Sequence, residues 1–279
     1  MSTDNSPIET HYTTSVSNLF ETILQALKRS GIDSDHVTRA DLSGVDEFHV
    51  RGREVSHELA VAASLQPHMR VLDLGCGLGG ASRMLADEFG CDVTGIDLTQ
   101  EYIRTAIQLS ELTGLQHSTH FVHGSATDLP FYDNSFDIVW TQHVQMNIEN
   151  KSALYAEVKR VLAADGSFIY YDVLSNNHAP IHFPVPWASD ASLSFLITSQ
   201  ELQQLLHNAG LKLVAIKDET ESGITFFKKL FNHIEQKGLP PAGANLLMGE
   251  NAADKLKNFY RNLTEGTIKL ESGIFMLSH

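Results

Sequence analysis

The sequence predicts an α/β fold with a mostly parallel sheet between helices. An apolar run at 71–74 enters a glycine turn, an amphipathic run follows, and a second apolar run ends in Asp97. Strand, turn, helix and strand in this order are typical of parallel sheets, whose strands are joined by helical crossovers. Further apolar runs alternate with helical patterns, and 279 residues with 42% hydrophobic content suffice for one large domain.

The residues before the first strand predict a helical cap. Residues 1–16 are polar and are expected to form a disordered tail. Residues 17–68 are expected to form an N-terminal cap, in which apolar side chains at helical spacing predict one helix ending near Gly31 and a second helix at 53–65. A polar connection should join them, and the cap should lie over the carboxyl ends of the strands.

Residues 69–279 are expected to form the core. The predicted strands cover 70–74, 92–96, 119–123, 136–141, 167–173, 211–218 and 267–277. The predicted helices cover 79–88, 99–113, 149–163 and 198–209. Two insertions interrupt this alternation: a loop at 175–197 and a helical segment at 222–263, and both should emerge near a bound substrate.

The glycine turn predicts a nucleotide-type site. Gly75-x-Gly77-x-x-Gly80 matches the dinucleotide fingerprint, so the glycines alone leave the ligand open. Asp73 precedes the turn and would repel a pyrophosphate, whereas it suits a ligand that has an ammonium group and no phosphates. Asp97 lies 22 positions after Gly75, where a carboxylate can accept both hydroxyls of a ribose. S-adenosylmethionine (SAM) has a ribose, an adenine, a sulfonium and an amino acid end.

This part of the chain resembles the class I SAM-dependent methyltransferases. Asp73 to Gly79 look like their first motif, 124–131 and 134–140 look like their adenine loop and fourth strand, and 160–167 look like the helix and turn before their fifth strand. The resemblance covers roughly 46–223. It implies a Rossmann-like fold with a seven-stranded sheet and an antiparallel last strand, and SAM as cofactor with S-adenosylhomocysteine as product.

Two shorter segments are similar to a subgroup of this class. Residues 46–49 and 142–147 look like sarcosine/dimethylglycine N-methyltransferases and cyclopropane-synthase-like methyltransferases. This resemblance implies methyl transfer to a small molecule, best an amine of the glycine, sarcosine or dimethylglycine kind. O- or C-methylation of a secondary metabolite is the alternative. Asn147 stands where relatives often carry a histidine, so no general-base role is assigned to it. The protein could therefore also be a SAM-binding module without catalytic activity.

The resemblance also implies which residues contact the cofactor. These are Asp73, Gly75, Cys76, Gly77, Asp97, Leu98, Ser125, Ala126 and Gln142. Ser125 stands where many relatives have an aspartate, so this contact is either its hydroxyl or the backbone N–H of Ala126. Cys76 is expected to be a small residue that fits the turn.

Two histidines are candidates for handling the acceptor proton. An amine acceptor must be unprotonated before it attacks, so a nearby base helps. His143 follows the fourth strand and is either a base or acceptor orienter, or a histidine that hydrogen-bonds without taking a proton. His49 could close over the methionine end of SAM. Arg51 could pair with a carboxylate of SAM or acceptor, or be a surface residue.

Three further residues are candidates for the acceptor side. Met146 and Asn147 belong to an amphipathic lip after the fourth strand, although Met146 could equally be core packing. Trp187 could form an aromatic wall that attracts a sulfonium or methylated ammonium, or it could plug the inserted loop.

Composition excludes several classes of protein. The net charge is −14 with lysines and arginines scattered, so nucleic acid is not expected as a partner. No apolar run reaches the roughly 20 residues that span a bilayer. Two cysteines and no metal-binding spacing indicate neither a disulfide framework nor a metal site, and a cytoplasmic protein is expected. The helical insertion could mediate a homodimer.

Overall fold

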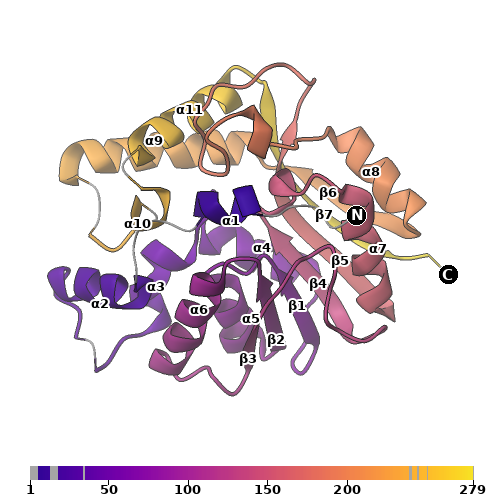
Figure 1. Ribbon diagram of the computed structural model, residues 1–279, viewed down its shortest axis with the longest axis horizontal. Helices are drawn as coiled ribbons and strands as arrows, with labels where there is room; N and C mark the ends of the chain where they lie inside the picture. The colour runs from indigo at the N-terminus through magenta and orange to yellow at the C-terminus, as the bar shows by residue number, and fades with distance from the viewer. Residues whose placement is uncertain are drawn as a thin grey trace.

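The computed structural model contains a seven-stranded sheet in the order β3-β2-β1-β4-β5-β7-β6 (Figure 1). It describes residues 6–12, 18–33, 35–238, 241–243, 245–249 and 251–278. The strands are β1 (Arg70–Leu74), β2 (Asp92–Asp97), β3 (Thr119–His123), β4 (Phe136–Gln142), β5 (Leu162–Ser175), β6 (Leu211–Asp218) and β7 (Ile268–Leu277). β1 to β5 pair in parallel, and β7 runs antiparallel between β5 and β6. The predicted fold class and antiparallel last strand are therefore confirmed.

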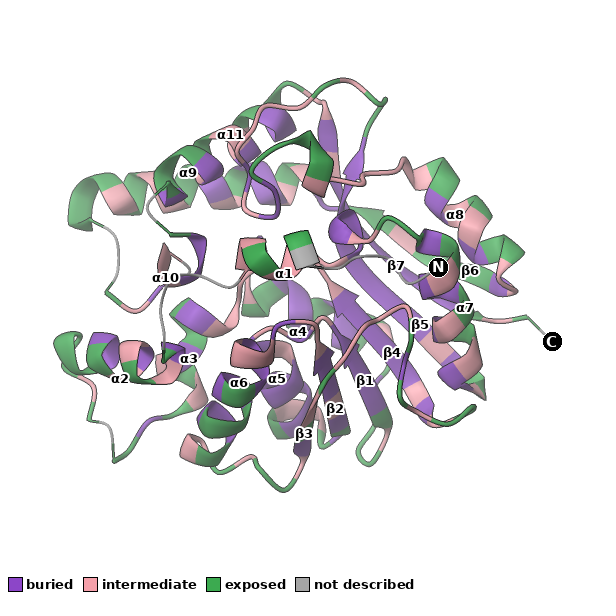
Figure 2. Cartoon of the chain, in the orientation of Figure 1, coloured by how far each residue is buried: buried purple, intermediate pink, exposed green. Residues whose placement is uncertain are grey.

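Helices cover both faces of the sheet. α4 (Arg53–Ala62) and α5 (Gly80–Phe89) contribute to the core on one face, and α7 (Lys151–Val161) and α8 (Ser199–Asn208) to the core on the other. α6 (Gln100–Leu112) packs beside β2 and β3. Side chains of a strand alternate between the two cores, as Trp140 and Val139 of β4 do. Buried residues accordingly fill most of β1, β4 and β5, whereas β6 at the edge of the sheet is largely exposed (Figure 2).

The carboxyl-terminal insertion is helical, as predicted. α9 (Thr220–Lys237), α10 (Asn245–Met248) and α11 (Ala252–Thr264) lie above the sheet in Figure 1, beyond the carboxyl ends of the parallel strands. The other inserted segment, at 175–197, contains only a short 3₁₀ turn, η2 (Ala191–Leu193). No helix in the described ranges is long and apolar enough to cross a membrane.

The cap departs from its prediction in two ways. Part of the expected disordered tail is the helix α1 (Ser6–Tyr12), because Tyr12 and His11 find partners on distant segments; residues 1–5 and 13–16 lie outside the described residues. The expected polar connection contains α3 (Arg39–Asp46) after α2 (Leu19–Arg29). Thr38 donates its backbone N–H to the Asp41 carboxylate (2.8 Å), as part of a capping box at the start of α3. The helix is too short to show a clear apolar period in the sequence.

One buried arginine joins the cap to the core. Arg83 of α5 donates from Nη2 to Asp46 Oδ1 and to the Leu78 carbonyl, both at 2.6 Å. Its Nη1 donates to the Ala106 carbonyl (3.3 Å) and to Ser110 Oγ (3.2 Å) of α6. The guanidinium is fully buried, so it balances the charge of Asp46 and joins α3, α6 and the glycine turn to α5 by hydrogen bonds.

Arg83→Met should lower the free energy of unfolding by about 3–5 kcal/mol, since it leaves Asp46 buried without its cation. Urea denaturation measures the change. Arg104→Met is the matched control on α6, because that side chain is 68% exposed and should change stability little. The double variant Arg83→Met with Asp46→Leu should recover part of the loss. If it is no more stable than the single variant, the buried pair is not the cause.

Candidate functional site

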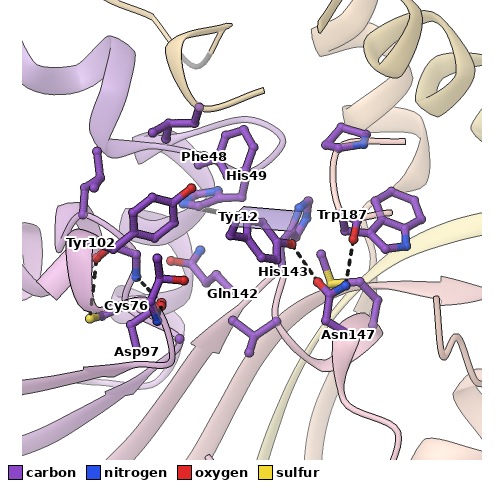
Figure 3. Close-up of a pocket in the computed structure, with 18 of the residues that line it drawn as sticks. Tyr12, Phe48, His49, Cys76, Asp97, Tyr102, Gln142, His143, Asn147 and Trp187 are labelled. Carbon is purple, nitrogen blue, oxygen red and sulfur yellow. Dashed lines mark hydrogen bonds between the residues drawn. The ribbon is translucent and has the colours of Figure 1, made fainter. Parts of the chain in front are cut away.

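A cavity of about 630 Å³ opens at the carboxyl ends of β1, β2 and β4. Residues from the cap, the segments after these strands, the 175–197 insertion and α9 to α11 line it, and Figure 3 shows ten of them labelled around the same space. The strand order changes direction beside β1, whose neighbours are β2 and β4. Ligands of open α/β sheets bind in the crevice at such a switch point.

Two glycines of the turn after β1 shape this cavity. Gly77 has a φ of +54°, and nothing lies within 4 Å of the position that its Cβ would take. Gly75 has a φ of +69°, and a Cβ there would lie 2.4 Å from Val144 Cγ2. Backbone at Gly77 is therefore open to a ligand, while Gly75 allows the segment after β4 to approach the turn.

The Asp97 carboxylate lies beside the turn, at the end of β2. It accepts the backbone N–H of Gly77 (2.9 Å) and of Thr99 (2.8 Å), one at each oxygen. Burial raises the pKa of Asp97 above its ordinary value, and the two N–H donors act in the opposite direction. A carboxylate has about four acceptor positions, so this side chain can still accept hydroxyls of a ligand.

Asp73 occupies the end of β1 and also lines the cavity. Its Oδ2 accepts the Ser82 hydroxyl at 2.6 Å. Burial raises the pKa of Asp73 to about 6, which the Ser82 hydrogen bond partly offsets. Near neutral pH, the turn therefore carries two carboxylates and no phosphate-binding cation, as its sequence predicted.

The remaining residues expected at the cofactor also line the cavity. Cys76, Leu98, Ser125 and Ala126 are among them. Burial raises the pKa of the Cys76 thiol well above its ordinary value, so the residue packs rather than reacts. The Ser125 hydroxyl lies 2.9 Å from that of Thr127.

Tyr102 of α6 is a lining residue that sequence reasoning missed. Its hydroxyl is buried and has no hydrogen-bond partner among the described residues. Burial raises the pKa of Tyr102, so the group is a protonated donor. An unpartnered buried hydroxyl destabilises the protein by about 1–3 kcal/mol, which a ligand acceptor would offset. An aromatic residue at helical spacing gave no sign of this role, since the same side chain also packs with the cap.

The two candidate catalytic histidines lie close together. The rings of His49 and His143 have centroids 5.9 Å apart, and both residues line the cavity. His143 Nε2 is buried without a hydrogen-bond partner among the described side chains. Burial lowers the pKa of His143 well below its ordinary value and nearby His49 acts in the same direction, so His143 is neutral near pH 7.

His49 has a carboxylate partner that the sequence did not reveal. Its Nε2 lies 3.0 Å from Glu47 Oε2 and 3.3 Å from Ser56 Oγ. Ser56 Oγ also lies 3.1 Å from Gln142 Nε2. Glu47 precedes His49 by only two residues, and this short spacing was the one sequence feature that could have indicated the pair.

Asn147 connects three segments that are distant in sequence. Its Nδ2 donates to the carbonyls of Trp187 (2.7 Å) and Leu193 (3.0 Å), and its Oδ1 accepts the Tyr12 hydroxyl (2.7 Å). Figure 3 shows the contacts with Tyr12 and Trp187. Asn147, to which the sequence assigned no general-base role, thus fixes the cap and the inserted loop at the cavity. The loop, in turn, presents a fully buried Trp187 to the cavity.

Two buried ionisable residues support the turn η1 (Gln145–Asn147) that carries Asn147. Asp172 Oδ2 accepts the backbone N–H of Gln145 at 2.9 Å, and burial raises the pKa of Asp172 to about 6. Lys151 Nζ donates to the Gln145 and Phe195 carbonyls (2.7 and 2.8 Å). Met146, between these supports, belongs both to the core and to the cavity wall.

The structure does not bring Arg51, expected to pair with a carboxylate of SAM or acceptor, to the cavity. Its guanidinium donates to Glu219 Oε2 (2.9 Å) and Glu58 Oε1 (2.6 Å), and it does not line the cavity. Nor is it a surface residue, since it is buried. Glu219 follows β6, so only tertiary structure brings this partner to the cap. Within the described ranges, no group of His, Cys, Asp and Glu could hold a metal ion.

Comparisons with known proteins agree with this geometry. Residues 72–170 match the family model described as a methyltransferase domain, which confirms the resemblance found in the sequence. The chain is 29% identical over 204 residues to a glycine/sarcosine/dimethylglycine N-methyltransferase of Actinopolyspora halophila, covering 73% of this chain and 36% of that protein. It is 28% identical over 168 residues to a sarcosine/dimethylglycine N-methyltransferase of Halorhodospira halochloris, covering 60% of each.

The chain therefore spans about a third to three fifths of these relatives' lengths. Among solved structures, a geranyl diphosphate C-methyltransferase from Streptomyces coelicolor, in complex with S-adenosyl-L-homocysteine, is similar with a TM-score of 0.70 at 15% identity. That match covers 98% of this chain and 97% of the other, and it shows a shared fold.

Asn147→Asp should destabilise the loop, because a carboxylate cannot donate to the carbonyls of Trp187 and Leu193. We expect a loss of about 1–3 kcal/mol in urea denaturation and faster proteolysis within 175–197. Asn150→Asp is the control, since an aspartate can still accept the Ala153 N–H as a helix cap. Equal effects of the two variants would contradict the role given to Asn147.

Proposed function

We propose that this chain transfers the methyl group of SAM to a small-molecule acceptor, because residues 72–170 match the model described as a methyltransferase domain. The observation that supports this most is the pairing of open backbone at Gly77 with the Asp97 carboxylate in one cavity. Backbone without a Cβ permits close approach of the cofactor, and the carboxylate accepts its ribose hydroxyls. The unpartnered Tyr102 hydroxyl adds a donor at the same wall.

The other cofactor contacts follow from the chemistry of SAM. Asp73 would bind the ammonium group, because it is a buried carboxylate at the turn. Leu98, Ser125 and Ala126 would enclose the adenine, and Cys76 would pack beside it. Gln142 would orient the methionine end together with its partner Ser56.

When bound, SAM supplies a methyl group on an activated sulfonium, and the protein's main task is to align an acceptor with it. The lip after β4 and Trp187 would hold the acceptor. His143, being neutral, would accept or donate a hydrogen bond at the reacting atom. His49, beside Glu47, is the better candidate to receive a proton from the acceptor.

Two classes of acceptor are supported by different observations. Similarity to the curated relatives favours an amine of the glycine, sarcosine or dimethylglycine kind. The aromatic and aliphatic wall of the cavity favours O- or C-methylation of an apolar metabolite. Both require the same cofactor site.

Location and assembly belong to the same proposal. Both cysteines are free and buried, which suits a reducing cytoplasm. A homodimer formed through α9 to α11 stays a prediction.

Titration calorimetry should detect binding of SAM, while NADH should not bind. Asp97→Ala should weaken SAM binding by on the order of 1–3 kcal/mol, because buried hydroxyls lose their acceptor. Asp92→Ala, at the exposed start of the same strand, is the control and should leave the affinity unchanged. Unchanged affinity in Asp97→Ala would show that Asp97 does not bind the ribose. Binding of NADH without binding of SAM would overturn the proposal.

SAM affinity should fall as the pH falls through about 6, where Asp73 becomes protonated and no longer attracts an ammonium group. At pH 5, one unit below this pKa, the dissociation constant should be up to about tenfold higher. A raised pKa in the folded state favours the fold at low pH, so Asp73 itself does not cause acid unfolding over this range. Asp73→Asn should bind more weakly at pH 7.5 with a shallower pH dependence, and retention of the original slope would contradict the assignment.

A further inference from the structure

The cavity extends beyond the cofactor residues into a large apolar compartment. Its wall there comes from the helical insertion and from the loop at 175–197. The lining side chains are Trp187, Leu193, Phe195, Phe226, Phe227, Leu230, Ile234, Leu247, Met248, Leu256 and Phe259. The rings of Phe227 and Trp187 meet that of Phe259 edge to face, with centroids 5.2 and 5.1 Å away, so this compartment is built as a packed aromatic surface.

The charges around the cavity are all of one sign. The described lining residues include five carboxylates (Asp46, Glu47, Asp73, Asp97 and Glu149) and no lysine or arginine. The residues outside the described ranges contain no lysine or arginine either. No side-chain cation is therefore available in the wall to pair with an anionic group of a substrate.

The four cations that are buried in the described part of the chain are already engaged. Arg51 is held by Glu58 and Glu219, and Arg83 by Asp46. Lys151 and Lys255 donate to backbone carbonyls, Lys255 to that of Met248 at 2.9 Å. A carboxylate or phosphate entering the compartment would lose its hydration among carboxylates and apolar side chains without a compensating charge.

His143 lines the cavity between the cofactor residues and the aromatic wall. His143 Nε2 is buried and unpartnered, and the His143 ring lies 6.2 Å from that of Phe259 between their centroids. A hydroxyl or neutral amine could hydrogen-bond there while an apolar body fills the aromatic wall. The five carboxylates at the cavity do not oppose such an uncharged group.

We infer that the acceptor is an uncharged, mainly apolar molecule, of the phenol class, whose hydroxyl hydrogen-bonds His143 and whose body packs against Phe227, Phe259 and Trp187. The inference rests on the proposed function and decides between its two acceptor classes, against amino acids that carry a carboxylate. It assigns to the wall formed by the helical insertion and the loop at 175–197 the selection of substrates by charge as well as by shape.

Calorimetry with matched probes tests this inference in the presence of S-adenosylhomocysteine. 2-Naphthol should bind the complex at least tenfold more tightly than 6-hydroxy-2-naphthoate, which adds one carboxylate to the same rings. Sarcosine should show no binding. Leu193→Lys places a cation in the wall and should reduce the preference to threefold or less, whereas Val61→Lys, on the exposed side of α4, should leave it unchanged.

The outcomes separate this inference from the proposed function. If S-adenosylhomocysteine and SAM do not bind, the proposed function fails. If S-adenosylhomocysteine binds but 2-naphthol does not bind, binds no more tightly than the naphthoate, or is outcompeted by sarcosine, only the apolar acceptor class is overturned. An unchanged preference in Leu193→Lys would likewise show that charge in this wall does not set selectivity.

Discussion

The buried ion pair between Arg83 and Asp46 is the interaction on which the site depends. Arg83 satisfies acceptors at the end of α3, in the glycine turn and along α6, so it fixes three segments that meet at the cofactor residues. Glu47 and His49 follow Asp46 directly, and their positions over the cavity therefore derive from this pair. A buried guanidinium is stable only when its charge and its N–H donors are all paired, so the cap is held in one arrangement relative to the sheet.

The second constraint is the edge of the parallel sheet. β1, β2 and β4 end side by side, and their last residues deliver Asp73, Asp97 and Gln142 to one cavity. Carboxylates at this edge exclude phosphates near the turn and are compatible with a cationic cofactor. Beyond these carboxylates the cavity wall becomes apolar, and the lining side chains include no lysine or arginine among the described residues.

Asn147 illustrates how a position can change its role without losing importance. No proton transfer is assigned to it, and its three hydrogen bonds instead join Tyr12, Trp187 and Leu193. The neighbouring histidines differ in their surroundings, since His49 has a carboxylate beside it and His143 has a nitrogen without a partner among the described residues. The residue that attaches the cap therefore lies in the same cavity as the two histidines proposed to handle the proton.

Sequence by itself predicted the fold class and also predicted cofactor residues that the structure places around one cavity. The turn residues Gly75 and Gly77 and the strand-end carboxylate Asp97 act through local backbone geometry, which neighbouring residues specify. The helix α3 escaped prediction because its period is short, and α1 because its stability comes from Asn147 and Pro186. Only tertiary structure decided that Arg51 is tied to Glu219. Among the described residues, it also left the Tyr102 hydroxyl without a hydrogen-bond partner and brought no lysine or arginine into the cavity wall. These outcomes depend on contacts between residues far apart in the chain, and no local pattern encodes them.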